Sequence, residues 1–347
     1  MPRFVYRSAA AFFGLCLLFT ASAHATPALV VDADTLDVLY AEDAGQPWYP
    51  ASTTKLMTAL VTFEAIRAGR IGASTPVVIS RNAAAQKSVY SGLSEGDAMR
   101  LEDALYAVLA GSANDVAVAL AETVGGGEKA FVAMMNEAAG RLGLTATHFT
   151  NPNGLFDRAQ QSSARDLAVL AVHIEREFPQ YRDVFAFSRV VIGEQELHSF
   201  NDLLTRYPGA IGMKTGFVCA SGRNIVALAA RNGRRIMVVL LGATTDRERC
   251  ERAAHLMTQA FDGMLRPTGQ RLPALANDPG AVPQDMRAKL CSPQGADYEK
   301  SREALYPWGL PGQPSNLGAA TQPKTRTITT WMVGPTVPLP APRPPGF

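Results

Sequence analysis

Residues 209–241 form one continuous stretch that reads GAIGMKTGFVCASGRNIVALAARNGRRIMVVLL. Its aliphatic and β-branched residues fall into three runs, and Gly233 marks a turn between the last two. The pattern predicts strands over residues 209–215, 224–230 and 234–241, and the last two are expected to form a hairpin.

Apolar residues at helical spacing dominate the chain before this stretch. The spacing predicts helices over residues 52–68, 101–110, 112–122, 128–142 and 164–177, and a long amphipathic helix over 245–265. An N-terminal hairpin over 28–42, with its turn at Asp34-Thr35, and a strand over 189–193 complete the pattern. Because βαβ alternation is absent, we expect an α+β fold with a mainly antiparallel sheet, flanking helices and a helical subdomain.

The N-terminus has the order of a secretory signal peptide. Arg3 and Arg7 precede an apolar run from about residue 9 to 19, and Ala23-His24-Ala25 follows as a small-x-small cleavage site. The apolar run is shorter than the roughly 20 residues that span a membrane. We therefore predict that residues 1–25 are removed on export; an uncleaved N-terminal anchor is the alternative.

After about residue 266 the composition changes. Fifteen of the 23 prolines lie in this segment, and the apolar periodicity is lost. Proline lacks a backbone N–H and breaks helices, so we predict a Pro-rich, largely irregular tail over 266–347. A short folded piece around residues 286–308 stays open. The expected division is thus 1–25, 26–265 and 266–347, with the middle part carrying the activity.

Charge and histidine content exclude several function classes. The net charge is +2 and charged residues make up 18% of the chain, so nothing suggests a nucleic-acid partner. The histidines beyond the signal segment are His148, His173, His198 and His255. Their spacing is not that of metal ligands, and we expect neither a metal nor a cofactor.

Three short motifs carry the chemistry. They are Ser52-Thr-Thr-Lys55 at the start of a predicted helix, Ser112-Ala-Asn114 at the start of another, and Lys214-Thr-Gly216 on a predicted strand. Residues three apart share one helix face, so the hydroxyl of Ser52 and the amine of Lys55 can meet. A serine becomes a nucleophile when a neighbouring base takes its proton, and a desolvated lysine can be that base. Singly, each motif also fits an ordinary helix start or strand end.

The three motifs in this order are typical of penicillin-binding proteins and class A β-lactamases. Over about residues 26–265 the chain resembles the serine D-Ala-D-Ala carboxypeptidases, the low-molecular-mass penicillin-binding proteins of peptidase family S11. Their nucleophile helix resembles PASTTKLMTA at residues 50–59, and further similar segments lie at 151–155, 160–166, 212–224 and 241–249. The resemblance implies the penicillin-binding, β-lactamase-like transpeptidase fold.

The resemblance also implies catalytic roles. Ser52 is expected to attack the bond between two D-alanines and form an acyl-enzyme, with Lys55 as general base. Ser112 and Lys214 are expected to relay a proton to the leaving amine, and Asn114 to donate to a substrate carbonyl. Water then hydrolyses the ester.

Substrate binding is implied in the same way. The backbone N–H groups of Ser52 and Phe217 are expected to stabilise the oxyanion, and Gly216 to admit the substrate backbone. Arg249, beside Thr215, matches the family position that binds the terminal carboxylate, and Arg247 is the fallback.

Three cysteines follow the signal segment, so at least one has no partner within the chain. Cys219 follows the Lys-Thr-Gly motif and Cys250 follows Arg249, which puts both near one edge of the expected site. We therefore expect a Cys219–Cys250 disulfide; two unpaired thiols are the alternative, and pairing with Cys291 stays possible.

The implied function is hydrolysis of the terminal D-Ala-D-Ala bond of peptidoglycan stem peptides by an exported, periplasmic enzyme that β-lactams acylate. The tail shows no amphipathic helix for membrane attachment. The segment between Asn114 and Lys214 lacks the Glu-x-x-Leu-Asn of class A β-lactamases, so we expect slow deacylation of the drug. A D,D-endopeptidase and an inactive wall-binding scaffold are the competing hypotheses.

Overall fold

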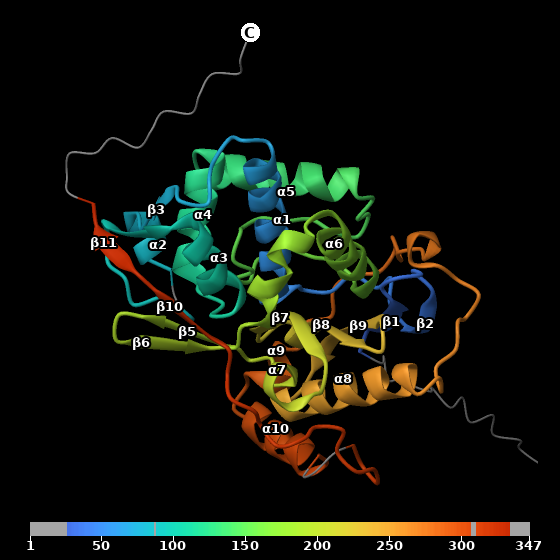
Figure 1. The fold of residues 1–347 in the computed structure, drawn as a ribbon. Coiled ribbons are helices and arrows are strands. Elements are labelled where there is room, and N and C mark those ends of the chain that lie inside the picture. The colour runs from blue at the N-terminus through green and yellow to red at the C-terminus, as the bar shows by residue number, and fades with distance from the viewer. Residues whose placement is uncertain (1–25, 87, 307–309, 334–347) are drawn as a thin grey trace, which may run out of the picture.

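A five-stranded antiparallel sheet forms the centre of the computed structural model, which describes residues 26–86, 88–306 and 310–333. The predicted signal peptide and the last prolines lie outside the described residues. The strands follow the order β2-β1-β9-β8-β7 (Figure 1). Their bounds are β1 (Ala28–Asp32), β2 (Val38–Glu42), β7 (Ala210–Val218), β8 (Gly222–Arg231) and β9 (Arg234–Ala243).

The predicted hairpins are confirmed. β1 pairs with β2 and β8 pairs with β9, both antiparallel. Asn232 and Gly233 connect β8 to β9 with φ of 50° and 77°. Two central residues with positive φ give a turn whose twist matches the strands it joins, which explains an Asn-Gly pair at this point.

Helices cover both faces of the sheet (Figure 1). The 3₁₀ turn η1 (Ala51–Thr54) leads into α1 (Lys55–Arg67), which is buried on nearly all sides from Lys55 to Phe63. A helix enclosed in this way lies inside the core. Around it pack α3 (Leu101–Leu109), α4 (Asn114–Gly125), α5 (Glu128–Arg141) and α6 (Ala164–Glu177), while α8 (Asp246–Phe261) forms a second core on the opposite face. All six helices were predicted.

Several short elements were not predicted. They are β3 (Pro76–Val78), α2 (Arg81–Ala84), β4 (Asp97–Arg100), η2 (Pro179–Ala186), β6 (Gln195–His198) and α7 (Leu203–Arg206). The predicted β5 (Arg189–Ile192) forms a hairpin with β6. Most of these elements have three or four residues, which is too short for a hydrophobic period to show.

The segment after residue 266 packs more than its composition predicts. It contains η3 (Leu272–Ala274), α9 (Arg287–Leu290), α10 (Gly295–Ala304), β10 (Thr325–Ile328) and β11 (Thr330–Met332). β10 pairs parallel with β5, and β11 pairs antiparallel with β4. The prediction of little packed structure is therefore wrong for residues 266–333, although most of the segment lies outside helices and strands. The piece left open around residues 286–308 contains α9 and α10.

The disulfide joins Cys219 to Cys291, so the predicted Cys219–Cys250 pair is wrong. Cys250 is a buried free thiol on α8. Cys219 lies in the β7–β8 turn, where the C-terminal segment passes with a Cα–Cα distance of 5.7 Å. The path of that segment, which the sequence did not predict, decides the pairing. Among the residues described, no helix is long and apolar enough to cross a membrane.

Candidate active site

Ser52 lies in the tight turn that enters α1. Ala51, just before it, has a φ of 49°, which is uncommon for a residue with a side chain. Gly154 packs against this turn so closely that an added Cβ would stand 2.0 Å from the Ala51 carbonyl oxygen. The loop carrying Gly154 therefore supports the backbone that presents Ser52.

The buried side chain of Asn224 holds the same turn from the sheet. Its Nδ2 donates to the carbonyl oxygens of Tyr49 and Pro50 at 2.9 and 3.1 Å. Its Oδ1 accepts from the backbone N–H of Gly242 at 2.9 Å. Asn224 thus connects β8 and β9 to the chain just before Ser52, a role that the sequence analysis did not assign.

Lys55 is fully buried, and its amine lies among three oxygen atoms. Nζ lies 3.1 Å from Ser52 Oγ, 2.7 Å from Asn114 Oδ1 and 2.5 Å from the carbonyl oxygen of Asn153. Burial and then the charge of Lys214 lower the pKa of the Lys55 amine well below its ordinary value of 10.5, against a smaller effect of Asp115. A neutral amine at this position can accept the proton of Ser52.

Ser112 and Lys214 form a second pair. Lys214 Nζ donates to Ser112 Oγ at 2.9 Å and to the carbonyl oxygen of Thr215 at 2.9 Å. Ser112 has a φ of 59° in the turn between α3 and α4. Burial, and secondly the charge of Arg249, lower the pKa of Lys214 from 10.5 to about 7. This pair can therefore gain or lose a proton near neutral pH.

The outer strand of the sheet, β7, lies against η1. Gly216 faces Ser52, because a Cβ on Gly216 would stand 2.7 Å from the Ser52 backbone nitrogen. Thr215 is buried, whereas Phe217 is 44% exposed. The contacts thus bring Ser52, Lys55, Ser112, Asn114, Lys214 and Gly216 together, and β7 carries Thr215 and Phe217 at the same edge.

Arg249 lies in the first turns of α8 with its side chain almost fully buried. Its Nη2 contacts Asp246 Oδ1 at 2.8 Å and donates to the carbonyl oxygen of Phe200, and Nε has no hydrogen-bond partner among the described residues. Arg247, the fallback, is bound by the C-terminal segment instead: it contacts Glu303 at 3.4 Å. Arg249 is the arginine whose charge acts on Lys214.

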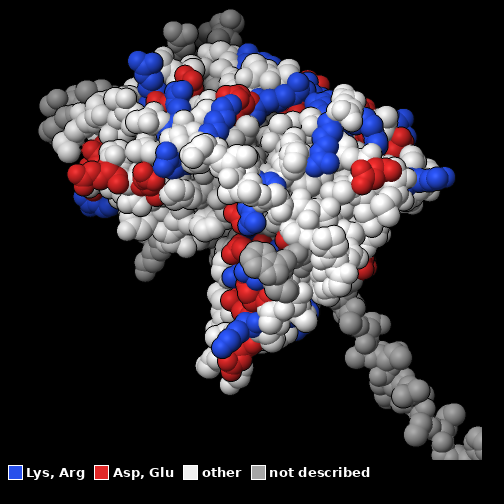
Figure 2. Space-filling view, turned by 60° about the horizontal axis from the view of Figure 1, so that its bottom comes forward, with Lys and Arg blue, Asp and Glu red and all other residues white. Residues whose placement is uncertain are grey.

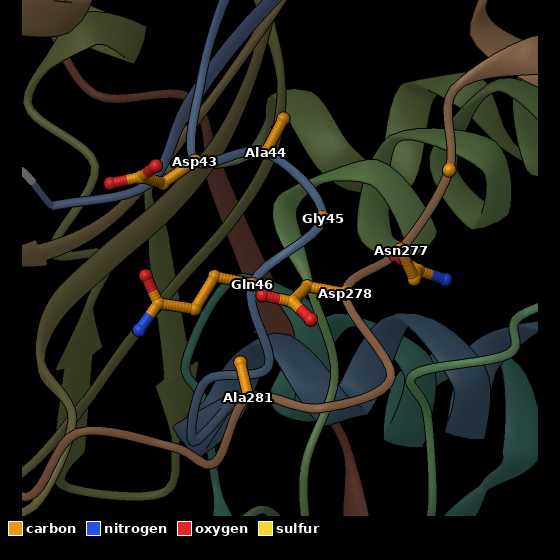
Figure 3. Close-up of a pocket in the computed structure, with 8 residues that line it drawn as sticks. Asp43, Ala44, Gly45, Gln46, Asn277, Asp278 and Ala281 are labelled. Atoms are coloured by element: carbon orange, nitrogen blue, oxygen red, sulfur yellow. The ribbon is translucent and has the colours of Figure 1, made fainter.

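Two hollows accompany this arrangement. A narrow one lies beside Pro50 and Ala51, just before Ser52 in the chain, and Tyr49, Phe156 and Val218 also line it. A cavity of about 360 Å³ lies between the loops 43–46 and 276–281, where Asp43, Gln46 and Asp278 line it (Figure 3). It contains none of the predicted site residues, so we place no part of the chemistry there.

Two further observations concern ligand classes. In the described part of the chain, no group of three or more His, Cys, Asp or Glu is arranged to hold a metal ion. On the face shown in Figure 2, acidic and basic side chains are interspersed rather than gathered by sign. That face offers no extended basic area to a nucleic acid.

Residues 19–245 match the family model of the S11 peptidases, which is described as D-alanyl-D-alanine carboxypeptidase. The chain belongs to this family. This S11 peptidase chain is 34% identical over 245 residues to the D-alanyl-D-alanine carboxypeptidase DacF of Bacillus subtilis (strain 168). The match covers 68% of the chain and 62% of DacF, so the chain spans less than two thirds of that relative.

Solved structures of penicillin-binding proteins are similar to this S11 chain. Penicillin-binding protein 6B of Escherichia coli superposes with a TM-score of 0.64 at 35% identity, over 68% of this chain and 76% of that one. Penicillin-binding protein D2 of Listeria monocytogenes, solved with cefotaxime bound, gives a TM-score of 0.63 at 28% identity, over 69% and 97%. The predicted α+β penicillin-binding fold is confirmed.

Proposed function

We propose that this chain is a serine D-Ala-D-Ala carboxypeptidase that removes the terminal D-alanine from peptidoglycan stem peptides. The observation that carries the proposal is the position of Lys55 Nζ, 3.1 Å from Ser52 Oγ and 2.7 Å from Asn114 Oδ1. Family membership supports the same activity. A buried lysine whose charge is disfavoured is suited to be a general base at neutral pH.

Acylation begins when Lys55 takes the proton of Ser52. The freed Oγ attacks the carbonyl carbon of the penultimate D-alanine, and the negative charge moves to the carbonyl oxygen. The backbone N–H groups of Ser52 and Phe217 are the proposed donors to this oxygen, and one such donor contributes roughly 3–4 kcal/mol to transition-state stabilisation. The close contact of Gly216 with η1 supports this pairing of donors from two elements.

The leaving D-alanine needs a proton on its nitrogen. Lys214 and Ser112, 2.9 Å apart, are the proposed relay, because a lysine with a pKa of about 7 gives up a proton at neutral pH. The C–N bond breaks and an ester remains on Ser52. The proton that Lys55 took from Ser52 passes to Lys214, which restores both lysines. Water then attacks the ester, neutral Lys55 takes one proton from it, and that proton returns to Ser52 Oγ as the acid is released.

The terminal carboxylate of the substrate is the proposed ligand of Arg249, together with the hydroxyl of Thr215. A planar guanidinium suits a carboxylate, and Arg249 lies close enough to the site for its charge to lower the pKa of Lys214. Asn114, which binds Lys55 through Oδ1, is proposed to donate its amide to a substrate carbonyl. β-Lactams are proposed to acylate Ser52, as supported by the related Listeria protein solved with cefotaxime.

We further propose that the protein is exported to the periplasm, with residues 1–25 as its signal peptide. The Cys219–Cys291 disulfide supports an oxidising compartment.

The test is release of D-alanine from diacetyl-Lys-D-Ala-D-Ala by purified mature protein, beside Ser52→Ala. We expect release by the parent and none by the variant. No release by either would overturn the carboxypeptidase. Cleavage of cross-linked muropeptides would then indicate an endopeptidase, and a Ser52→Ala protein that still restores cell shape would indicate a scaffold.

A further inference from the structure

Residues 285–306, which we call the C-terminal clasp, bind the rim of the candidate site. They lie outside the matched family segment 19–245. The clasp is fixed to the β7–β8 turn by the Cys219–Cys291 disulfide and by the N–H of Met286, which donates to the Ala220 carbonyl oxygen at 3.0 Å. Its helix α10 packs against α8 (Figure 1). The clasp therefore contacts α8, which carries Arg249, and the turn that directly follows β7, which carries Thr215, Gly216 and Phe217.

Arg223 is where the clasp meets the site. It lies directly opposite Phe217 in the β7–β8 register, and its Cζ stands 4.7 Å from the centre of the Phe217 ring. Nη1 lies 2.9 Å from Glu299 Oε1 of the clasp, and Nε lies 3.2 Å from Asp246 Oδ2. Nη1 also donates to the carbonyl oxygen of Thr244. Only 16% of the Arg223 side chain is exposed, and these partners hold its guanidinium group in one orientation.

Asp246 extends this connection to Arg249. Its Oδ2 contacts Arg223 and its Oδ1 contacts Arg249 Nη2 at 2.8 Å. One carboxylate is thus shared between two guanidinium groups. A substrate carboxylate must compete with Asp246 for Arg249, and Arg223 weakens that competitor by drawing on the same negative charge.

We propose that Arg223, held by Glu299 of the clasp, is a positioning residue for the reaction. It acts on the Phe217 strand through the ring contact, and on Arg249 through Asp246. The inference rests on the proposed carboxypeptidase activity and adds to it a part of the chain that the family match does not cover. Its expected consequence is stronger recognition of a free C-terminal carboxylate.

The experiment compares two peptides, diacetyl-Lys-D-Ala-D-Ala and the same peptide with a C-terminal amide. The readout is the ratio of kcat/KM for the acid to kcat/KM for the amide. In Arg223→Gln and in Glu299→Gln we expect this ratio to fall about three- to tenfold, mainly through a higher KM for the acid. Glu303→Gln is the matched control, because Glu303 lies on the same helix but contacts Arg247; its ratio stays at the parent value.

A double-mutant cycle separates positioning from general stability. If Glu299 acts through Arg223, adding Glu299→Gln to Arg223→Gln changes the ratio by less than about twofold. The proposal would be overturned if the two substitutions lowered the acid-to-amide ratio independently, so that their effects multiplied in the double variant. It would also be overturned if the ratio stayed at the parent value in both single variants while the parent is active. A parent that releases no D-alanine would overturn the proposed function and this inference together. Should Arg223→Gln fail to fold, Arg223→Lys carries the same test, since an ammonium group cannot reproduce the fork.

Discussion

Gly216 lies so close to Ser52 that a Cβ on the glycine would stand 2.7 Å from the serine backbone nitrogen. The same Cβ would stand 3.0 Å from Pro50 O and from Thr53 N, so backbone atoms of η1 and of the residue before it block it on several sides. A backbone cannot yield as the end of a flexible side chain can. The distance between β7 and the nucleophile turn is therefore set by the absence of a side chain at residue 216.

Gly216→Ala is expected to push β7 away from η1 and misplace the proposed oxyanion donors. Acylation by benzylpenicillin should fall at least about tenfold, since displacements near 1 Å can cost about a hundredfold. Gly140→Ala is the control: it lies in α5 with no atom within 4 Å of the added Cβ. That variant should keep the parental rate and gain up to about 1 kcal/mol of stability. Equal rates in both variants would contradict the prediction.

Lys214→Met is expected to change how stability depends on pH. In the folded protein the pKa of Lys214 is about 7, against 10.5 ordinarily. Below pH 7 both states hold the proton, and the folded state carries the full cost of a buried charge. Between pH 7 and 10.5 the unfolded state binds more protons, so the parent gains stability as pH rises. The Tm advantage of the variant should be largest below pH 7 and shrink toward pH 10.

The matched control for that series is Lys129→Met, because Lys129 is exposed on α5 and its charge stays in water when the protein folds. Its Tm difference from the parent should stay flat across the same range. If the Tm advantage of Lys214→Met over the parent grew with pH, its sign would be opposite to the one expected. That result would refute the lowered pKa of Lys214 in the folded protein.

Asn224→Ala is expected to destabilise the protein by about 2–4 kcal/mol, because the Tyr49 carbonyl and the Gly242 N–H lose the partner that Asn224 supplies. The Pro50 carbonyl loses one donor but keeps the hydroxyl of Thr53 at 2.7 Å. Urea denaturation of the parent and variant measures the difference. Asn82→Ala, at an exposed position, should stay within about 0.5 kcal/mol. A loss below 1 kcal/mol for Asn224→Ala would mean that water replaces the lost hydrogen bonds.

A reducing agent is expected to lower the unfolding midpoint of the parent and leave that of Cys291→Ser unchanged. The bond links residues 72 apart, and a loop of that size contributes about 4 kcal/mol through the unfolded state. Cys250→Ala should respond to the reductant like the parent, since Cys250 is a free thiol. The same response in Cys291→Ser would rule out this disulfide as the source of the effect.

Long, regular patterns explain which parts of the fold could be predicted. β8 and β9 are runs of ten residues, and α1 and α6 have thirteen and fourteen, so their periods show in the sequence. The C-terminal pairing could not be predicted in this way, because prolines are frequent there and the apolar residues follow no period. A local signal exists, however: residues 325–331 read TRTITTW, with β-branched residues and an aromatic one over the span of β10 and β11.

The site divides along a similar line. The three motifs predicted which side chains meet, because the hydroxyl, amine and amide groups involved belong to side chains and can be identified from the residue type. The carbonyl oxygen of Asn153 beside Lys55 could not be predicted, since every residue has a carbonyl and only the fold aims it. The pairing of Cys219 was missed for the same reason: its partner arrives on a segment whose path follows no period.

β10 and β11 have a consequence for self-association. β5 would otherwise present one unpaired strand edge, and so would β4; the C-terminal segment pairs with both. An unpaired edge offers a row of backbone donors and acceptors to any other extended chain, including a second copy of the same protein. A chain truncated before residue 325 would keep Ser52 and Lys55 but expose both strand edges. We expect it to aggregate increasingly as the protein concentration rises, while the monomer keeps its catalytic activity.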